Sequence, residues 1–275
     1  MIGVNSSTFY YKPKVSRAQR ERQDADLRNQ IEQVQLEFPR SGYRTVQQYL
    51  FRLGYRIGER RLRRVMTRFS LQARIKRAFN KTTDSNHPHR VYPNLLPGMF
   101  IDSINQVWAS DLTYIRIQNG FVYLAVIMDL FSRKIVGWAI SKQIDGELAL
   151  NALRMAIGKR KPKRGCIHHS DRGVQYLCKA YVKLLKKNGF HLSNSAKGNP
   201  YHNAFLESLM KTLKQQEVYV TNYETYLDVV SNLPQFIEDV YNEKRVHSRI
   251  GYLTPNELEK MVFNNNDVSR FKLEL

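Results

Sequence analysis

The sequence contains little of what marks a secreted or membrane protein. Its 275 residues include only two cysteines, Cys166 and Cys178, so neither a disulfide framework nor a cysteine-based zinc site is supported. The longest apolar run, Phe121 to Met128, is far shorter than the roughly 20 residues of a membrane-spanning helix. The first residues, MIGVNSSTFYYKPK, lack the charged-then-apolar pattern of a secretory signal. We therefore expect a reduced, cytoplasmic protein with no membrane segment.

Acidic residues are also scarce. The chain has 24 Asp and Glu against 44 Lys and Arg, a formal charge of +20, and its isoelectric point is near 10.0. The composition is otherwise that of a globular protein, 42% hydrophobic and 25% charged. Such an excess of positive charge indicates a polyanionic partner, of which nucleic acid is the most common. A basic protein without such a partner is the alternative at this stage.

The positive charge is concentrated near the N-terminus. Residues 1–100 hold 20 Lys and Arg against 7 Asp and Glu. From Arg40 to Lys81 there are 13 basic residues and a single acid, Glu59. This density is typical of a surface that contacts phosphates.

Three segments in this region have helical spacing of apolar residues: 24–38, 44–53 and 59–69. Acids begin the first segment, where the helix dipole favours them. A short glycine-containing turn joins the other two, an arrangement typical of a helix-turn-helix, although small basic three-helix units also bind protein or RNA. The candidate DNA contacts are the arginines of the second and third segments, namely Arg44, Arg60, Arg61, Arg63, Arg64 and Arg68.

The rest of the chain alternates between strand and helix patterns. The expected strands are 108–117, 121–128, 134–141, 166–170 and 190–193, and the expected helices are 146–157, 179–187 and 203–218. Three antiparallel strands followed by alternating helices and strands are the layout of the ribonuclease-H-like fold, a mixed α/β sheet with helices on both faces. The predicted organisation is an N-terminal arm (1–23), a helix-turn-helix-like DNA-binding domain (24–77), a linker (78–105), a catalytic core (106–220) and a C-terminal helical extension (221–275).

Three carboxylates are candidates for chemistry. Asp111 lies within a predicted strand, Asp171 follows the fourth strand, and Glu207 lies in the last predicted helix of the core. Hard carboxylate oxygens suit Mg²⁺, and two such ions can assist attack on a phosphodiester. With 24 acids in the chain, however, such a spacing also arises by chance. Asp129 begins a turn and is expected to be structural.

Eight segments resemble one known family. They are GVNSSTFYY, SGYR, YPNLL, VWASDLTYI, YLAVIMDLFSRKIVGWAIS, HHSDRGVQY, KGNPYHNAFLESLMKTLK and YNEKRVHSRIGYLTPNELE. In these segments the chain resembles the OrfB transposase of the IS-three (IS3) family of bacterial insertion sequences, whose core is similar to retroviral integrases. The resemblance covers nearly the whole chain and implies an acidic triad of Asp111, Asp171 and Glu207, with 35 residues between the last two. One departure is His202, where the family usually has Asp.

The resemblance also implies an activity. A DNA transposase subunit of this kind would use two Mg²⁺ or Mn²⁺ ions, held by the triad, to cleave a DNA strand and transfer it. Its partners would be double-stranded DNA at the element ends and target, OrfA or its fused form, and further copies of the chain on DNA. We expect it in the bacterial cytoplasm, at the nucleoid when bound to DNA. The alternative is a catalytically silent DNA-binding regulator; a ribonuclease acting on RNA–DNA hybrids is disfavoured by the helix-turn-helix.

Four more residues near the triad are expected to contact DNA. Asn203, Lys211 and Lys214 share a polar helical stripe with Glu207. His168 and His169 adjoin on a strand and therefore point to opposite faces, and His169 has the parity of the catalytic face.

Overall fold

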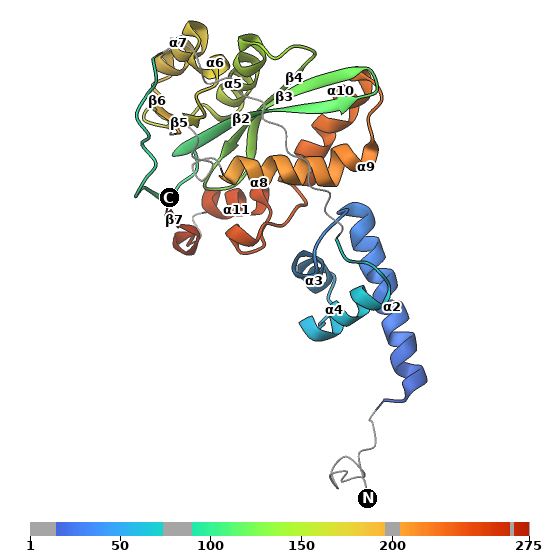
Figure 1. The fold of residues 1–275 in the computed structure, drawn as a ribbon. Helices are drawn as coiled ribbons and strands as arrows, with labels where there is room; N and C mark the ends of the chain where they lie inside the picture. The colour runs from blue at the N-terminus through green and yellow to red at the C-terminus, as the bar shows by residue number, and fades with distance from the viewer. Residues whose placement is uncertain (1–14, 74–89, 196–203, 265–266, 275) are drawn as a thin grey trace, which may run out of the picture. The chain divides into compact units, whose positions relative to one another are not determined.

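The computed structural model describes residues 15–73, 90–195, 204–264 and 267–274 (Figure 1). The chain forms two compact units, residues 1–75 and 76–275. No helix of the described residues is both long and apolar enough to cross a membrane.

The N-terminal unit consists of three helices. They are α2 (Arg17–Glu37), α3 (Tyr43–Arg52) and α4 (Glu59–Arg68). Each buries one apolar stripe, and the three stripes form a small shared core around Ile31, Leu50 and Leu62, which have no accessible surface. This agrees with the predicted three-helix unit.

The first helix begins earlier than the apolar spacing predicts. Ser16 is its N-cap: its hydroxyl accepts a hydrogen bond from Gln19 N, and Gln19 Oε1 accepts one from Ser16 N. The expected acid in the first turn, Asp24, therefore lies two turns inside the helix, where it is buried. The prediction failed because the first turns of the helix are polar and exposed, so they carry no periodic signal.

The larger unit is built on a five-stranded mixed sheet with the order β4-β3-β2-β5-β6. The strands are β2 (Val107–Ile117), β3 (Gly120–Asp129), β4 (Ile135–Ser141), β5 (Ile167–Ser170) and β6 (His191–Asn194). β2, β3 and β4 form an antiparallel meander, and β5 and β6 run parallel to β2. This is the mixed α/β sheet that the sequence predicts. A separate pair, β1 (Phe100–Ile101) with β7 (Leu273–Glu274), was not predicted.

Helices cover both faces of the sheet, and a separate apolar cluster lies under each face. One face carries α5 (Gly146–Arg160), α6 (Val174–Leu177) and α7 (Lys179–Lys187). The other carries α8 (Ala204–Leu213), a π-helical turn η2 (Lys214–Val218), α9 (Tyr219–Thr221), α10 (Tyr226–Gln235), the π-helical η3 (Phe236–Asn242) and α11 (Pro255–Phe263) (Figure 1). The single helix predicted over 203–218 is thus α8 followed by a wider turn.

The C-terminal extension is tied to the core by a buried ionic cluster. Glu259 of α11 is 2% exposed. It pairs with Arg160 through two short contacts of 2.7 and 2.8 Å and with Lys134 at 3.2 Å, and it accepts a hydrogen bond from the Ser132 hydroxyl. A buried carboxylate needs partners of this kind to offset its desolvation. Asp129, as expected, is structural: it accepts hydrogen bonds from three backbone N–H groups in the turn region.

Candidate active site and DNA-binding surface

Asp111 and Asp171, two of the three predicted carboxylates, lie at the same level of two neighbouring strands. β2 and β5 are parallel, and their last paired residues are Ser110 and Ser170. Asp111 is the next residue on β2, and Asp171 is the first residue after β5. Beyond this level β2 continues beside β3 alone. The sheet therefore brings the backbones of Asp111 and Asp171 to the same level of neighbouring strands.

The third carboxylate lies close enough to affect the first. The pKa of Asp111 is raised to about 7, chiefly by burial and then by the negative charge of Asp171, with a further contribution from Glu207. A hydrogen bond from Leu112 N and the positive charge of Lys214 lower the pKa of Asp111 and so offset part of this increase. Asp171, in the loop after β5, and Glu207, on α8, thus both lie within electrostatic range of Asp111 on β2. Asp111 as a residue keeps some accessible surface, although burial is the main cause of the raised pKa of its carboxyl group.

The loop after β5 holds Asp171 through backbone contacts. Asp171 Oδ1 accepts a hydrogen bond from Gly173 N at 2.9 Å. A Cβ at Gly173 would lie 2.9 Å from that same oxygen, so only glycine fits there without displacing the carboxylate. The Asp171 carbonyl accepts hydrogen bonds from Ser170 Oγ and from Asn194 Nδ2.

β6 supplies two supporting residues that the sequence analysis missed. Asn194 Oδ1 accepts from Tyr92 N, and Ser193 Oγ accepts from Leu95 N. Part of the predicted linker thus runs beside β6 and is fixed to the strand that also steadies the Asp171 loop. No pattern in the sequence pointed to these residues, because short polar side chains at strand ends are common in any fold.

The expected DNA contact of His169 is not supported. The His169 side chain has no accessible surface, and its Nδ1 lies 2.9 Å from Ser193 Oγ. The parity argument placed it correctly opposite His168, but the face that it occupies is covered. His168 is also buried, and burial lowers its pKa to about 3. Both histidines are therefore interior.

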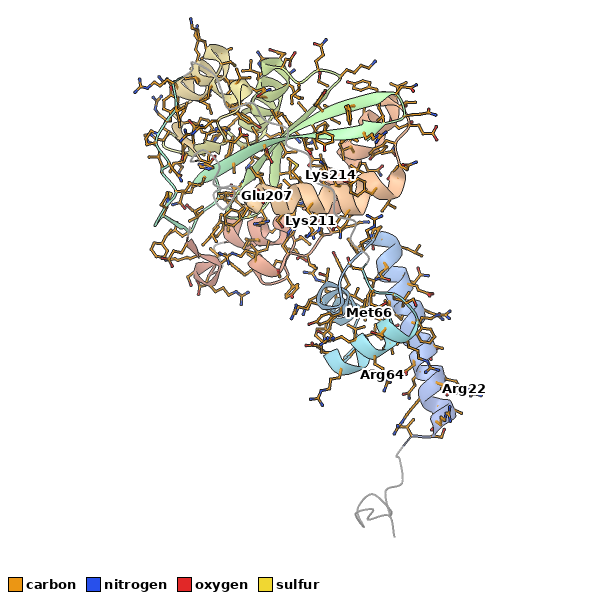
Figure 2. The ribbon with its side chains drawn as sticks, in the orientation of Figure 1. Arg22, Arg64, Met66, Glu207, Lys211 and Lys214 are labelled. Atoms are coloured by element: carbon orange, nitrogen blue, oxygen red, sulfur yellow. The ribbon has the colours of Figure 1, made fainter. Side chains whose placement is uncertain are left out.

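The stripe on α8 is partly as predicted. Figure 2 shows Glu207, Lys211 and Lys214 following one another along this helix. Glu207 and Lys211 are exposed, whereas Lys214 is partly buried, with its Nζ 4.4 Å from the centre of the Tyr114 ring. Burial lowers the pKa of Lys214 although Asp111 raises it. Asn203 and His202 lie outside the described residues.

The site suits a hard divalent cation by its chemistry, but no closed ligand cage is present. All three acids offer carboxylate oxygens, the donors that Mg²⁺ and Mn²⁺ prefer. The negative charges of Asp171 and Glu207 raise the pKa of Asp111, and a bound cation relieves repulsion of this kind. Among the residues that the structure describes, no three His, Cys, Asp or Glu side chains are grouped closely enough to hold a metal ion.

The predicted arginines of the N-terminal unit differ in their surroundings. Arg61 and Arg64 both pair with buried Asp24, at 3.1 and 2.8 Å. Arg64 is labelled in Figure 2 on α4. They remain 37% and 60% exposed, so their charge is partly neutralised but still accessible.

The other predicted arginines of this unit lie over aromatic rings or are exposed to solvent. Arg63 pairs with Glu59 at 3.3 Å, and Arg63 and Arg44 both lie over the Tyr43 ring. Arg68 lies over the ring of Phe69. Arg60, in the first turn of α4, is exposed.

Comparisons with known proteins agree with both units. Residues 102–200 and 188–255 match Integrase core domain families, and residues 21–79 match an HTH-like domain family. The chain is 36% identical over 257 residues to the insertion element IS600 31 kDa protein of Shigella sonnei, covering 93% of this chain and 94% of that protein. It is 36% identical over 222 residues to the transposase for insertion sequence element IS904 of Lactococcus lactis, covering 80% and 88%.

Further similarities cover shorter stretches. The Escherichia coli transposase InsF for insertion sequence IS3A is 37% identical over 207 residues, which cover 75% of this chain and 72% of that protein. Among solved structures, the catalytic core domain of BIV integrase is 20% identical and superposes with a TM-score of 0.44, covering 59% of this chain and 99% of that one.

Proposed function

Because the chain belongs to the OrfB transposases of the IS3 family, we propose that Asp111, Asp171 and Glu207 form its catalytic centre for DNA strand cleavage and strand transfer. The observation that carries this proposal is the placement of Asp111 and Asp171 directly after Ser110 and Ser170, which pair across β2 and β5. The negative charge of Glu207 on α8 also contributes to the raised pKa of Asp111. A structural acid is instead held by cations, as Glu259 is by Arg160.

The proposed centre would hold two Mg²⁺ or Mn²⁺ ions between these carboxylates. Asp111 and Asp171, which directly follow the paired Ser110 and Ser170, would hold these ions together with Glu207 of α8. When bound, such ions activate the attacking oxygen and stabilise the leaving oxygen of a phosphodiester. The Gly173 N–H fixes Asp171 Oδ1 at 2.9 Å, which keeps this carboxylate aimed in one direction.

The reaction would take place in two displacements at phosphorus. In the first, a water oxygen bonds to the phosphorus at the element end, and the 3′ oxygen of the neighbouring nucleotide leaves as a free hydroxyl. In the second, that hydroxyl attacks a target phosphodiester, forms the new P–O bond and expels another 3′ oxygen. No bond to the protein forms in either step. Lys211 and Lys214 would bind backbone phosphates beside Glu207, and Asn203, four residues before Glu207 in the sequence, would join them.

The N-terminal unit would bind the same DNA through phosphates and bases. The second helix of a helix-turn-helix enters the major groove with its first residues, so Arg60, in the first turn of α4, would lie near the bases. Arg44, Arg61, Arg63, Arg64 and Arg68 would bind phosphates around it. The proposed protein partners are OrfA, alone or as a fusion, and further copies of this chain on DNA.

The test is cleavage and transfer of labelled DNA carrying the terminal repeats of the insertion sequence. The assay compares wild type with the variants Glu207→Gln and Glu147→Gln. Each protein is tested in Mg²⁺, Mn²⁺ or EDTA, both as the chain alone and as a fusion to OrfA. Glu147 is an exposed acid on α5, so its substitution makes the same chemical change on the opposite face of the sheet. We expect metal-dependent products from wild type and Glu147→Gln, and none from Glu207→Gln.

Two results would contradict the proposal. Full activity of Glu207→Gln would show that the third carboxylate is assigned wrongly. DNA binding without cleavage by both the chain and its OrfA fusion would instead identify the silent regulator.

A further inference from the structure

The loop after α5 and the helix α7 carry positive charge with few acids to balance it. Between Glu147 and Glu207 the chain has 12 Lys and Arg, and Asp171 is the only acid. Five of these cations are exposed on two segments of the core. We call them the basic patch: Lys163 and Arg164 of the loop, and Lys183, Lys186 and Lys187 of α7.

The two segments meet at a pair of glycines. Gly165 N–H donates a hydrogen bond to the Gly189 carbonyl at 2.8 Å, and Gly189 N–H donates one to the Lys186 carbonyl at 3.0 Å. A Cβ at Gly189 would lie only 2.8 Å from Arg164 Cγ, so the Arg164 side chain lies directly against this turn. The cations of the loop and those at the end of α7 therefore lie side by side.

The basic patch differs from the neighbouring cations of α5, which have acid partners. Arg160 pairs with Glu259, and Lys159 pairs with Glu238. In the part of the chain that the structure describes, none of the five patch cations forms an ion pair; Lys186 instead has its Nζ 5.9 Å from the centre of the Tyr92 ring. The C-terminal ends of α5 and α7 contribute only about half a negative charge each. Most of the positive charge of the patch is therefore unbalanced.

The composition of the basic patch suits a phosphate backbone better than a protein surface. Protein interfaces are depleted in lysine and are built around apolar and aromatic side chains. Among the described residues, no strongly exposed large apolar side chain belongs to α7 or to residues 161–165. Surfaces that bind DNA are strongly positive, and their phosphate contacts do not depend on the base sequence.

The basic patch lies at the opposite end of β5 from Asp171. β5 and β6 are parallel and begin side by side at Ile167 and His191. The patch segments lead into these two strand starts, whereas Asp171 follows the last residue of β5. The four residues of β5 span about 13 Å. A duplex bound at the patch therefore leaves the proposed catalytic acids free for another DNA segment.

We propose that the basic patch binds target DNA through its backbone phosphates. This inference rests on the proposed function, because strand transfer requires a second DNA segment besides the element end. The patch offers side chains that bind phosphates, and such contacts position a duplex without reading its sequence. Recognition of a terminal repeat requires base contacts, which the N-terminal unit would supply.

The test compares a patch variant with a control variant, both in the full chain. The patch variant replaces Lys163, Arg164, Lys186 and Lys187 by Gln. The control variant makes the same change at four exposed cations of the C-terminal extension, Arg249, Lys260, Arg270 and Lys272. Each protein is saturated with an immobilised terminal-repeat duplex in EDTA, and capture of a labelled random-sequence duplex is then measured at several salt concentrations.

We expect the patch variant to capture the second duplex at least about 10-fold more weakly than wild type, with a salt dependence shallower by about 2–4 in log–log slope. In Mg²⁺, cleavage at the element end should proceed as in wild type, and strand transfer into a separate target should fall. The control variant should match wild type in capture, cleavage and transfer. A milder variant, Lys163→Gln with Lys187→Gln, keeps Arg164 against Gly189 and should weaken capture in the same direction; thermal unfolding checks that each variant folds.

Three results would overturn the inference. Capture by the patch variants as in wild type would exclude the patch as a DNA surface, and equal weakening in the control variant would show only an effect of net charge. Weaker capture with unchanged strand transfer would exclude target DNA as its partner. Because capture is measured in EDTA, it does not depend on the three acids. Intact capture without cleavage by wild type would therefore contradict the proposed function and not the patch.

Discussion

Arg64 Nη2 lies 2.8 Å from Asp24 Oδ2, although 40 residues separate them in the chain. Arg61 Nε binds the other oxygen of the same carboxylate at 3.1 Å. One buried acid on α2 thus holds two cations of α4 in place. In a unit with so few acids, this pair of contacts sets the position of α4 against α2.

Replacing Asp24 by Asn should therefore loosen the N-terminal unit. The amide keeps the shape but removes the charge from both ion pairs. Because the two arginines are partly exposed and regain water, we expect a loss of about 1–2 kcal/mol in the free energy of unfolding of this unit. Urea denaturation measures it. Asp26→Asn changes an exposed acid two residues away and should cost almost nothing; an equal loss in both variants would contradict the role of Asp24.

The stability of the metal-free protein should fall as the pH rises. Asp111 has a pKa of about 7 in the folded chain against 3.8 ordinarily, so between about pH 4 and pH 7 the folded chain holds a proton that the unfolded chain has released. Unfolding free energy therefore decreases with pH across this window. Asp129, raised to about 6 chiefly by burial, acts in the same direction.

Asp111→Asn tests this, because an amide cannot ionise. In EDTA the variant should unfold at a higher temperature than wild type at pH 7.5, with the difference vanishing near pH 4. Saturating Mg²⁺ should stabilise wild type alone. Parallel pH profiles for the two proteins would show that Asp111 ionises at its ordinary pKa.

Glu259→Gln should destabilise the larger unit strongly. The substitution removes the nearer of the two carboxylates of Arg160, which is 12% exposed, and leaves it only Asp129 at 3.7 Å. Breaking a buried ion pair costs about 3–5 kcal/mol. The control is Glu243→Gln, which breaks an exposed ion pair with Lys260 and should cost at most about 1 kcal/mol. Calorimetric unfolding of both variants provides the comparison, and a small loss for Glu259→Gln would mean that the cluster is solvated.

Gly137→Ala should disturb the contact between β4 and α5. An added Cβ would lie 2.4 Å from the Ala152 carbonyl oxygen and 2.7 Å from Ala156 Cβ, so helix and strand must separate. Overpacking of this kind costs about 1–3 kcal/mol. Gly158→Ala adds the same methyl group on α5, where nothing lies within 4 Å, and should be neutral or stabilising. Urea midpoints of the two variants check this opposite behaviour.

The sequence predicted the three-stranded meander well because β2, β3 and β4 are rich in apolar, β-branched and aromatic side chains. The meander of β2, β3 and β4 and the alternation that follows were readable from periodicity and turns alone. The pairing of Phe100 with Glu274 was not, because two-residue strands joined across most of the chain have no local pattern.

The candidate site was predictable only in part. Asp111 and Asp171 were found as candidates because each follows or lies in a recognisable strand, and the family resemblance joined Glu207 to them. The supporting residues Ser193 and Asn194 were not found. Their roles depend on which strands become neighbours, and that is set by tertiary packing.

The C-terminal extension also affects the order in which the larger unit folds during synthesis. Glu259 completes the charge balance of Arg160, and Leu273 closes a small sheet with Ile101. During synthesis, Asp111, Asp171 and Glu207 all leave the ribosome before these residues do. Until Glu259 has been made, Arg160 has only Asp129 of this cluster as a partner, at 3.7 Å. A nascent chain would therefore complete the ionic cluster, and with it the packing of the core, only after all three proposed catalytic acids have been synthesised.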